Sequence, residues 1–138
     1  MITIKAKPVT SGVVSGEAIV SKMAISFTGG LDPDSGVIKE PGHDLKGKKV
    51  AGKILVFPTG KGSTTGPWQY YAAFKRGNAP NGIVNMVAEG VIAVCAIITN
   101  TPMVHLPERN ILEIIEDGDI VTIDADLGYI KIKKTIKS

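Results

Sequence analysis

The chain has 138 residues, of which 43% are hydrophobic and 21% are charged, so it can bury one core but has little length for a second domain. Its formal net charge is +3, yet only 5% of the residues are aromatic, and the Lys and Arg residues are dispersed apart from runs at 46–49 and 131–137. Nucleic-acid binding usually needs a basic stripe with aromatic side chains interleaved. We therefore expect a single domain over residues 1–138 and no nucleic-acid partner.

The chain contains one cysteine, Cys95, which stands inside the apolar run 91–98. A lone cysteine cannot form an internal disulfide, and in such surroundings it is expected to be buried, which fits a reducing cytoplasm. No charged segment followed by an apolar one occurs at Met1, and no apolar run is long enough to cross a bilayer. The sequence predicts a cytoplasmic protein with no membrane insertion and no secretion.

Short stretches of alternating or β-branched apolar residues recur between turn-forming residues. This pattern is typical of β-strands, because successive side chains point to opposite faces of a sheet. The strands are predicted at residues 2–6, 13–20, 54–57, 82–87, 120–123 and 129–132. The link at 124–128 is short and rich in turn formers, so the last two strands are predicted to form an antiparallel hairpin.

Two segments have a helical pattern. Residues 65–76 place Pro67 in the first turn, where its missing N–H is tolerated, and they stop before Gly77. Residues 89–98 are apolar, and their periodicity leaves open a second interpretation as a buried strand. The order of strands, a strand-helix-strand-helix unit and a closing hairpin predicts an α/β fold, with a mixed sheet or partly closed barrel and flanking helices on its outside.

Residues 21–52 form a long segment with few periodic apolar positions. An irregular segment of this length in a compact domain is usually functional or disordered. Asp32, Asp34 and Gly36 follow part of the spacing of a calcium loop. The glutamate that completes such a loop is replaced by His43, so calcium binding is not expected.

The most informative stretch runs from 56 to 68, where an apolar strand enters a glycine-rich loop and then a helix. Glycines let backbone N–H groups approach a ligand, and a helix start carries unpaired donors and a partial positive charge, so an anion suits this loop. It is not a Walker A loop, because Leu55 stands where that pattern requires a glycine. An ordinary explanation stays open, in which Ser63 or Thr64 caps the helix and Lys61 is solvated.

Ser63 is the candidate catalytic residue of this loop. A free hydroxyl is a poor proton acceptor, so Ser63 acts as a base only if its alkoxide is stabilised. Lys61, neighbouring N–H groups and the helix start are the stabilisers that the sequence offers. His43 and His105 are too distant in sequence to be locally placed for a serine–histidine pair. Neither has a second ligand at metal-binding spacing, so no metal site is expected on this chain.

The predicted helix at 65–76 carries four aromatic residues: Trp68, Tyr70, Tyr71 and Phe74. At that spacing, packing in the core is the favoured interpretation. Arg76 near the end of the helix complements the helix dipole, and a contact from Arg76 or Lys61 to a substrate phosphate is the alternative.

Four segments carry a resemblance to a known family: GVVSGEA at 12–18, SFTGGLDP at 26–33, LKGK at 45–48 and KGSTTG at 61–66. Through these segments the chain resembles the aconitase X family, in its branch of archaeal-type phosphomevalonate dehydratase small subunits, and the resemblance extends over nearly the whole chain. The resemblance implies a swivelling β/β/α domain, similar to the mobile fourth domain of aconitases, that stands here as a separate chain.

The resemblance also implies a partner and a cofactor. The partner is a large catalytic subunit, in a heterodimer or a larger assembly, and its cysteines hold an iron–sulfur cluster that is expected to be of the 4Fe–4S type. No cofactor is expected on this chain, because one thiolate cannot hold a cluster.

The implied reaction is the dehydration of mevalonate 5-phosphate, a phosphorylated hydroxy acid, to trans-anhydromevalonate 5-phosphate in an archaeal route to isoprenoids. Ser63 matches the catalytic base of the family. The residues expected to bind the substrate are Lys61, Gly62, Thr64, Thr65, Gly29 and Gly30. Asp32 and Ser35 follow these glycines, and their loop is expected to line the same cleft or to meet the large subunit. Two alternatives stay open: a hydroxyproline dehydratase of the same family, and a small anion-binding module without catalysis.

Overall fold

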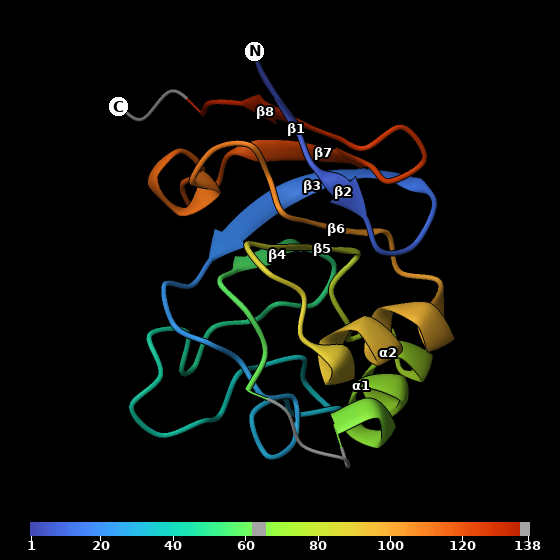
Figure 1. The fold of residues 1–138 in the computed structure, drawn as a ribbon. Coiled ribbons are helices and arrows are strands. Elements are labelled where there is room, and N and C mark those ends of the chain that lie inside the picture. Colours follow the sequence, from blue (N-terminus) through green and yellow to red (C-terminus); the bar gives the residue numbers. More distant parts are fainter. Residues whose placement is uncertain (62–65, 136–138) are drawn as a thin grey trace.

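The structure is a computed structural model that describes residues 1–61 and 66–135. Its elements follow the chain in the order β1 (Ile2–Lys5), β2 (Lys7–Pro8), β3 (Val13–Val20), β4 (Ile54–Phe57), α1 (Gly66–Lys75), β5 (Gly82–Asn85), α2 (Gly90–Thr99), β6 (Met103–His105), the short 3₁₀ helix η1 (Ile111–Glu113), β7 (Ile120–Asp124) and β8 (Tyr129–Lys133). Figure 1 shows the two helices side by side, separated from the β7–β8 hairpin by the strands β4, β5 and β6.

The strands form one mixed sheet in the order β1-β8-β7-β3-β4-β5-β6-β2. Strand β3 changes partner along its length, because it pairs antiparallel with β7 up to Glu17 and parallel with β4 from Ala18. Strands β4, β5 and β6 are parallel to one another. The outermost strands β1 and β2 are separated only by Ala6, so the N-terminal segment brings both ends of the sheet together, as in a partly closed barrel.

The parallel strands send their side chains alternately into two hydrophobic cores. On β4, Leu55 and Phe57 join the core beneath the helices, whereas Ile54 and Val56 join the core shared with β7 and β8. Every residue of β4 and β5 is buried, because both faces of these strands are covered. The result is a three-layer β/β/α arrangement, which confirms the predicted α/β class (Figure 1).

Both helices connect parallel strands, so both begin at the carboxyl edge of those strands. Helix α1 stops at Gly77, whose φ of 75° favours glycine. Helix α2 begins after Glu89, whose carboxylate accepts from the Val91 N–H at 2.9 Å, and ends at Asn100 in the left-handed conformation. The stretch 89–98 is therefore helical, which decides between the two interpretations of its pattern.

Residues 21–52 contain no named helix or strand, yet this segment is part of the core. Its buried apolar side chains are Ile25, Phe27, Leu31, Ile38, Leu45 and Val50. The Phe27 ring lies 4.8 Å, between centroids, from the ring of Tyr70 on α1. The segment covers the same face of the sheet as the helices, so it is held by its own packing rather than being disordered.

The predictions at 13–20 and 54–57 match β3 and β4 in full, and the antiparallel hairpin of β7 and β8 is confirmed. Two strands and the 3₁₀ helix were missed. Strand β2 has two residues and β6 has three, which is too short for a period of two to be visible. Across the described ranges, the structure contains no helix with the length and apolar character needed to span a membrane.

Candidate active site

The glycine-rich loop follows β4 and precedes α1, which places it at the carboxyl edge of the parallel strands. Ligands of open α/β sheets bind at this edge. The predicted base Ser63 and the predicted binding residues Gly62, Thr64 and Thr65 lie outside the described residues. The described part of the candidate site consists of the residues on either side of these four.

The strand side of the loop is held by the segment that follows β3. Ile25 forms an isolated parallel bridge with Gly60, and the Lys61 N–H donates to the Ile25 carbonyl at 3.1 Å. A Cβ at Gly60 would collide with Ile92 and with the carboxylate of Glu89, both at the start of α2. Gly60 thus lets the loop that follows β4 run close to the start of the second helix.

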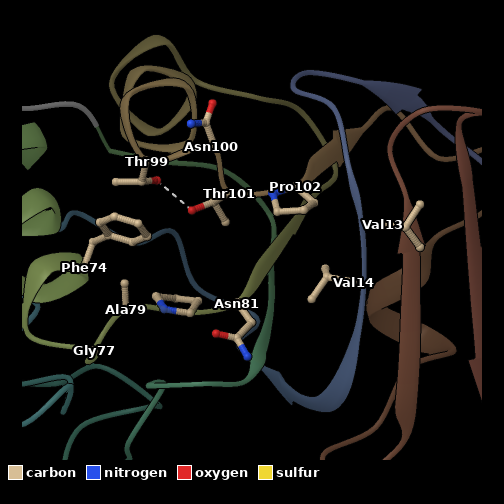
Figure 2. A pocket seen from close by; sticks show the side chains of 11 residues that line it. Val13, Val14, Phe74, Gly77, Ala79, Asn81, Thr99, Asn100, Thr101 and Pro102 are labelled. Atoms are coloured by element: carbon tan, nitrogen blue, oxygen red, sulfur yellow. Dashed lines mark hydrogen bonds between the residues drawn. The ribbon is translucent and has the colours of Figure 1, made fainter.

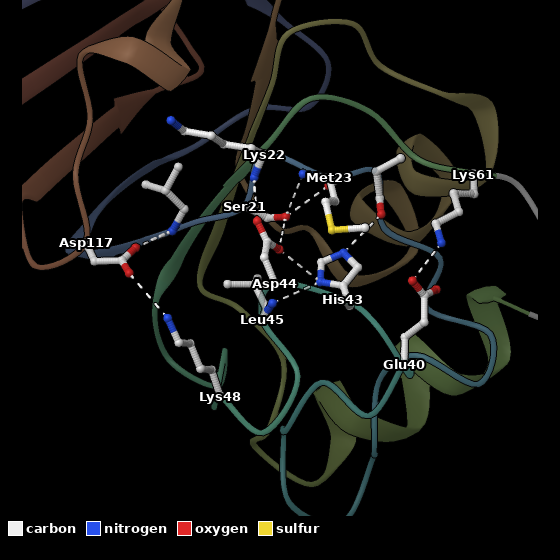
Figure 3. Close-up of polar contacts among 12 residues, drawn as sticks. Ser21, Lys22, Met23, Glu40, His43, Asp44, Leu45, Lys48, Lys61 and Asp117 are labelled. Carbon is white, nitrogen blue, oxygen red and sulfur yellow. Dashed lines mark hydrogen bonds and ion pairs between the residues drawn. The ribbon is translucent and has the colours of Figure 1, made fainter.

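Lys61 is paired with an acidic residue from the long segment. Its Nζ donates to Oε2 of Glu40 at 2.7 Å (Figure 3). The Lys61 side chain is 42% exposed and that of Glu40 is 24% exposed. The ammonium group therefore lies next to the loop in a fixed position, and it keeps enough exposure to meet an anion.

The helix side of the loop is contacted by the Gly29–Gly30 turn. The Gly29 N–H donates to Oε1 of Gln69 in the first turns of α1 at 2.6 Å. A Cβ at Gly66 would lie 3.4 Å from the Thr28 hydroxyl oxygen, so the turn lies against the start of the helix. A Cβ at Gly30 would collide with the Ser26 carbonyl oxygen. The structure thus brings Gly29 and Gly30 next to the candidate loop, although Gly60 at the start of that loop comes 30 positions after Gly30 in the sequence.

The two helix starts at this edge differ in charge. The carboxylate of Glu89 accepts from the N–H groups of Val91 and Ile92 at 2.9 and 3.3 Å, so it occupies the start of α2. Helix α1 has no acidic residue in its first turn. Glu89 thus matches the partial positive charge at the start of α2, whereas no acidic side chain in the first turn of α1 matches the charge at the start of that helix.

Asn85 is a polar residue of this edge that the sequence reasoning missed. It is fully buried at the end of β5, where its Nδ2 donates to the carbonyls of Phe57 and Val84 at 3.2 and 3.3 Å. Its Oδ1 has no hydrogen-bond partner among the described residues. An asparagine at the carboxyl end of an otherwise apolar strand was the available signal. Glu40 and Gln69 gave no such signal, because their partners Lys61 and Gly29 are distant in sequence.

Both histidines have structural partners. His43 is buried, with Nε2 3.1 Å from the Ala24 carbonyl oxygen and Nδ1 accepting from the Leu45 N–H at 3.1 Å (Figure 3). His105 accepts from the Ala88 N–H through Nδ1 at 3.0 Å, and burial, with help from the positive charge of Lys7, lowers the pKa of its imidazole. Within residues 1–61 and 66–135, no three side chains of metal-ligating type come together.

A polar network next to His43 fixes the beginning of the long segment. The Ser21 hydroxyl donates to Oδ1 of Asp44 at 2.6 Å, and the Lys22 N–H donates to Oδ2 of Asp44 at 2.9 Å. Ser21 itself is fully buried. Figure 3 shows this network and the Lys61–Glu40 pair in one view, with His43 lying between them. The network holds the segment that supplies Glu40.

Cys95 is fully buried on α2, as the sequence predicted. Burial, with a smaller contribution from the negative charge of Glu89, raises the pKa of its thiol to about 12. Iron–sulfur clusters are bound by thiolates. A buried, protonated thiol with no second cysteine in the chain does not fit the ligand set of such a cluster.

The prediction that the aromatic residues of α1 pack in the core is correct for Tyr70 and wrong for the other three. Tyr70 is fully buried, and Trp68, Tyr71 and Phe74 are exposed. Only one face of α1 lies against the sheet, and Tyr70 and Ala73 take up that face. Arg76 makes a 2.7 Å ion pair with Asp34, a contact that ties the end of α1 to the long segment.

A second hollow, of about 350 Å³, lies at the opposite edge of the parallel strands (Figure 2). The ends of both helices and the residues just before β5 and β6 line it, among them Phe74, Asn81, Thr99 and Pro102. The Thr99 hydroxyl lies 2.6 Å from the Thr101 hydroxyl. None of the described lining residues is charged. This hollow therefore lacks the cation that an anionic ligand requires, unlike the loop at Lys61.

The features above define a class: a three-layer β/β/α domain in which a loop, rich by sequence in glycine and hydroxyl residues, connects a parallel strand to a helix at the carboxyl edge of the sheet. The aconitase X swivel domain family matches residues 3–132. The chain belongs to this family.

Relatives and a solved structure agree with that membership. The chain is 48% identical over 129 residues to a protein of Methanocella arvoryzae named phosphomevalonate dehydratase small subunit, a match that covers 94% of this chain and 98% of the relative. A protein of Methanosarcina acetivorans with the same name is 41% identical over 96% of this chain and 92% of its own length. A crystal structure described as the holo-form of Thermococcus kodakaraensis aconitase X superposes with a TM-score of 0.91 at 39% identity, over 97% of this chain and all of the matched chain.

Proposed function

We propose that this chain is the small subunit of a two-chain hydro-lyase that dehydrates (R)-5-phosphomevalonate to trans-anhydromevalonate 5-phosphate in an archaeal mevalonate pathway. The observation that carries this function is the full-length similarity to relatives of that name, at 48% and 41% identity over more than nine tenths of each relative. The chemistry of the candidate loop agrees with an anionic substrate. The enzyme is active only when both subunits are present.

The dehydration removes a proton from the carbon next to the substrate carboxylate and a hydroxide from the neighbouring carbon, which together make one water. Ser63 takes the proton in this proposal. Its alkoxide needs a positive environment, because an unassisted serine is a poor base. Two features favour that environment: the ammonium of Lys61, and the start of α1, whose first turn carries no acidic residue.

The substrate is bound by the loop and by the turn beside it, through Lys61, Gly62, Thr64, Thr65, Gly29 and Gly30. The position of the Gly29–Gly30 turn against Gly66 and Gln69 favours this grouping. The Gly29 N–H already donates to the Gln69 side chain, so a substrate oxygen can accept from this N–H only if the Gln69 side chain turns away.

The remaining parts of the active site belong to the large subunit. We assign the iron–sulfur cluster implied by the family, expected to be of the 4Fe–4S type, to that subunit, because Cys95 does not fit as a cluster ligand. Residues 1–138 act as one swivelling domain that closes on the partner, in a heterodimer or a larger assembly. Such a complex works in the cytoplasm.

The test is anaerobic dehydration of mevalonate 5-phosphate by this chain mixed with the large subunit, compared with each subunit alone. We expect trans-anhydromevalonate 5-phosphate only from the mixture. A cluster-loaded complex that leaves this substrate unchanged but dehydrates hydroxyproline would overturn the substrate assignment. A mixture that binds the phosphate and dehydrates neither compound would leave an anion-binding module and would overturn the enzyme assignment.

A further inference from the structure

The outer side of the helix pair exposes large apolar side chains. Residues of both helices line a groove of about 440 Å³, the apolar groove: Pro67, Trp68, Tyr71, Val94 and Ile98. Trp68 is 76% exposed, and Tyr71, Val94 and Ile98 are each more than 40% exposed. Contiguous exposed apolar surface of this kind marks an interaction site.

The composition of α2 strengthens this conclusion. Its sequence GVIAVCAIIT contains no charged residue and only one hydroxyl residue. A helix that is apolar on every side is normally buried on every side. In this chain only one side of α2 lies against the core, through Ile92, Cys95, Ala96 and Thr99. The opposite side is thus composed like an interior surface.

We propose that the apolar groove is the docking surface for the large subunit, which covers Trp68 and the exposed side of α2. The inference rests on the proposed function, because it requires that partner. The groove begins at Pro67, directly after Gly66, where α1 follows the candidate loop. A partner that completes the active site around this loop must approach the start of α1, and the apolar groove is continuous with that position.

Charge decides against a second copy of this chain as the occupant. Helices α1 and α2 contain a single charged residue, Lys75, and Arg76 follows it. Arg76 is already paired with Asp34, but two copies docked through this face would bring their Lys75 side chains towards each other, with no Asp or Glu in either helix to offset them. The fitting partner is a different chain with an apolar surface and acidic residues opposite Lys75.

Trp68 allows a direct test, because it is the only tryptophan of the chain. The small subunit is labelled with 5-fluorotryptophan and observed by fluorine NMR, alone and with the large subunit, in the presence of a soluble paramagnetic agent. We expect one resonance that the agent broadens in the isolated chain and that shifts and becomes protected in the complex. A complex seen by size-exclusion chromatography in which Trp68 stays accessible would overturn the proposal, and so would protection in the isolated chain, which indicates self-association.

A pair of variants gives an independent readout. Val94→Glu places a charge in the apolar groove with a good helix former, and Leu127→Glu places the same charge on the β7–β8 turn, where Leu127 is 74% exposed. We expect Val94→Glu to weaken binding to the large subunit by about tenfold or more, and Leu127→Glu to change it by less than about twofold. Circular dichroism confirms that each variant is folded. Equal affinities of the two variants for the large subunit would contradict the docking surface. Because binding is measured without turnover, this test stays valid even if the complex fails to dehydrate the substrate.

Discussion

The ammonium nitrogen of Lys61 lies 2.7 Å from a carboxylate oxygen of Glu40. The pair joins the candidate loop to the long irregular segment, and both side chains are partly exposed. Pairs of this kind contribute less than about 1 kcal/mol to stability. The pair therefore matters less for stability than for the place of the Lys61 ammonium, which lies at the loop to which we assign binding of the anionic substrate.

Replacement of Lys61 by alanine is expected to reduce activity far more than stability. Loss of a charged hydrogen-bond donor to the substrate should lower kcat/KM of the two-subunit enzyme by about 10- to 100-fold, since such bonds are worth about 1.5–3 kcal/mol. Lys48→Ala is the matched control, because Lys48 also makes a partly exposed ion pair, with Asp117 at 3.8 Å. Steady-state kinetics checks the effect, and equal kcat/KM values for the two variants would exclude Lys61 from substrate binding.

Gly60→Ala should destabilise the domain. An added Cβ collides with Ile92 and with the Glu89 carboxylate that caps α2, so either the helix start or the loop after β4 must move. The expected loss is about 1–3 kcal/mol in the free energy of unfolding, as for other overpacked sites.

Gly90→Ala is the control for this substitution, because a Cβ at Gly90 meets no atom within 4 Å. Gly90 is the first residue of α2, where alanine is the better helix former, so its stability should stay equal or rise by up to about 1 kcal/mol. Urea denaturation measures both variants. If both lose stability equally, the close approach at Gly60 is not the cause.

Asp119 should make stability depend on acid pH. Burial alone raises the pKa of its carboxyl, but hydrogen bonds from Lys134 and from the Glu116 and Thr135 N–H groups outweigh burial and lower it below 3.8. A lowered folded-state pKa contributes stability that is fully present above the unfolded-state pKa. That contribution disappears as the pH falls through the folded-state pKa, below 3.8.

The variant that tests this dependence is Asp119→Asn. It should be less stable than the wild type at neutral pH, and the difference should shrink below about pH 4. Asp34→Asn, at a carboxylate that is well exposed to solvent, should cause a smaller loss of stability at neutral pH. Thermal unfolding at a series of pH values checks both. A difference for Asp119→Asn that is constant from pH 7 to pH 3 would contradict the assignment.

Cys95 should be unreactive in the folded chain. With its thiol pKa raised to about 12, almost none of the thiol is ionised at pH 7, and the thiolate is the reactive form. We expect slow alkylation by iodoacetamide in the native protein and rapid alkylation in urea. Cys95→Ala should keep dehydratase activity with the large subunit, since the thiol is assigned no role in the cluster. Loss of activity in a folded Cys95→Ala variant would contradict this.

The sequence predicted those parts of the fold whose pattern is local. Strands β3 and β4 and both helices were found, because alternation, Pro67, Gly77 and an apolar run are visible within a short window. Strands β2 and β6, which are neighbours at one end of the sheet, were not found, since they are too short to show a period and exist only through their pairing.

The burial of side chains was also predicted correctly only where it depends on neighbouring residues in the sequence. Cys95 was predicted to be buried from its apolar neighbours, and it is. Trp68, Tyr71 and Phe74 were predicted to lie in the core, but aromatic spacing does not reveal that Tyr70 is the aromatic residue on the inner face of α1.

At the candidate site, the glycine-rich loop could be predicted from its motif, and its surroundings could not. Glu40 reaches Lys61 across 21 residues and Gly29 reaches Gln69 across 40, so no sequence window contains either pair. The long segment 21–52 supplies one partner of each contact. Its fold is determined by tertiary packing, which the sequence pattern does not report.

The most direct test of the proposed chemistry is the anaerobic dehydration rate of the reconstituted two-subunit enzyme with Ser63→Ala, compared with the wild type and with Ser15→Ala, a hydroxyl on strand β3 away from the loop. We predict that Ser63→Ala forms the complex with unchanged affinity and lowers kcat by about a thousandfold or more, whereas Ser15→Ala keeps the wild-type rate. Full activity of Ser63→Ala would contradict the assignment of Ser63 as the base and, with it, the role proposed for this chain in the reaction.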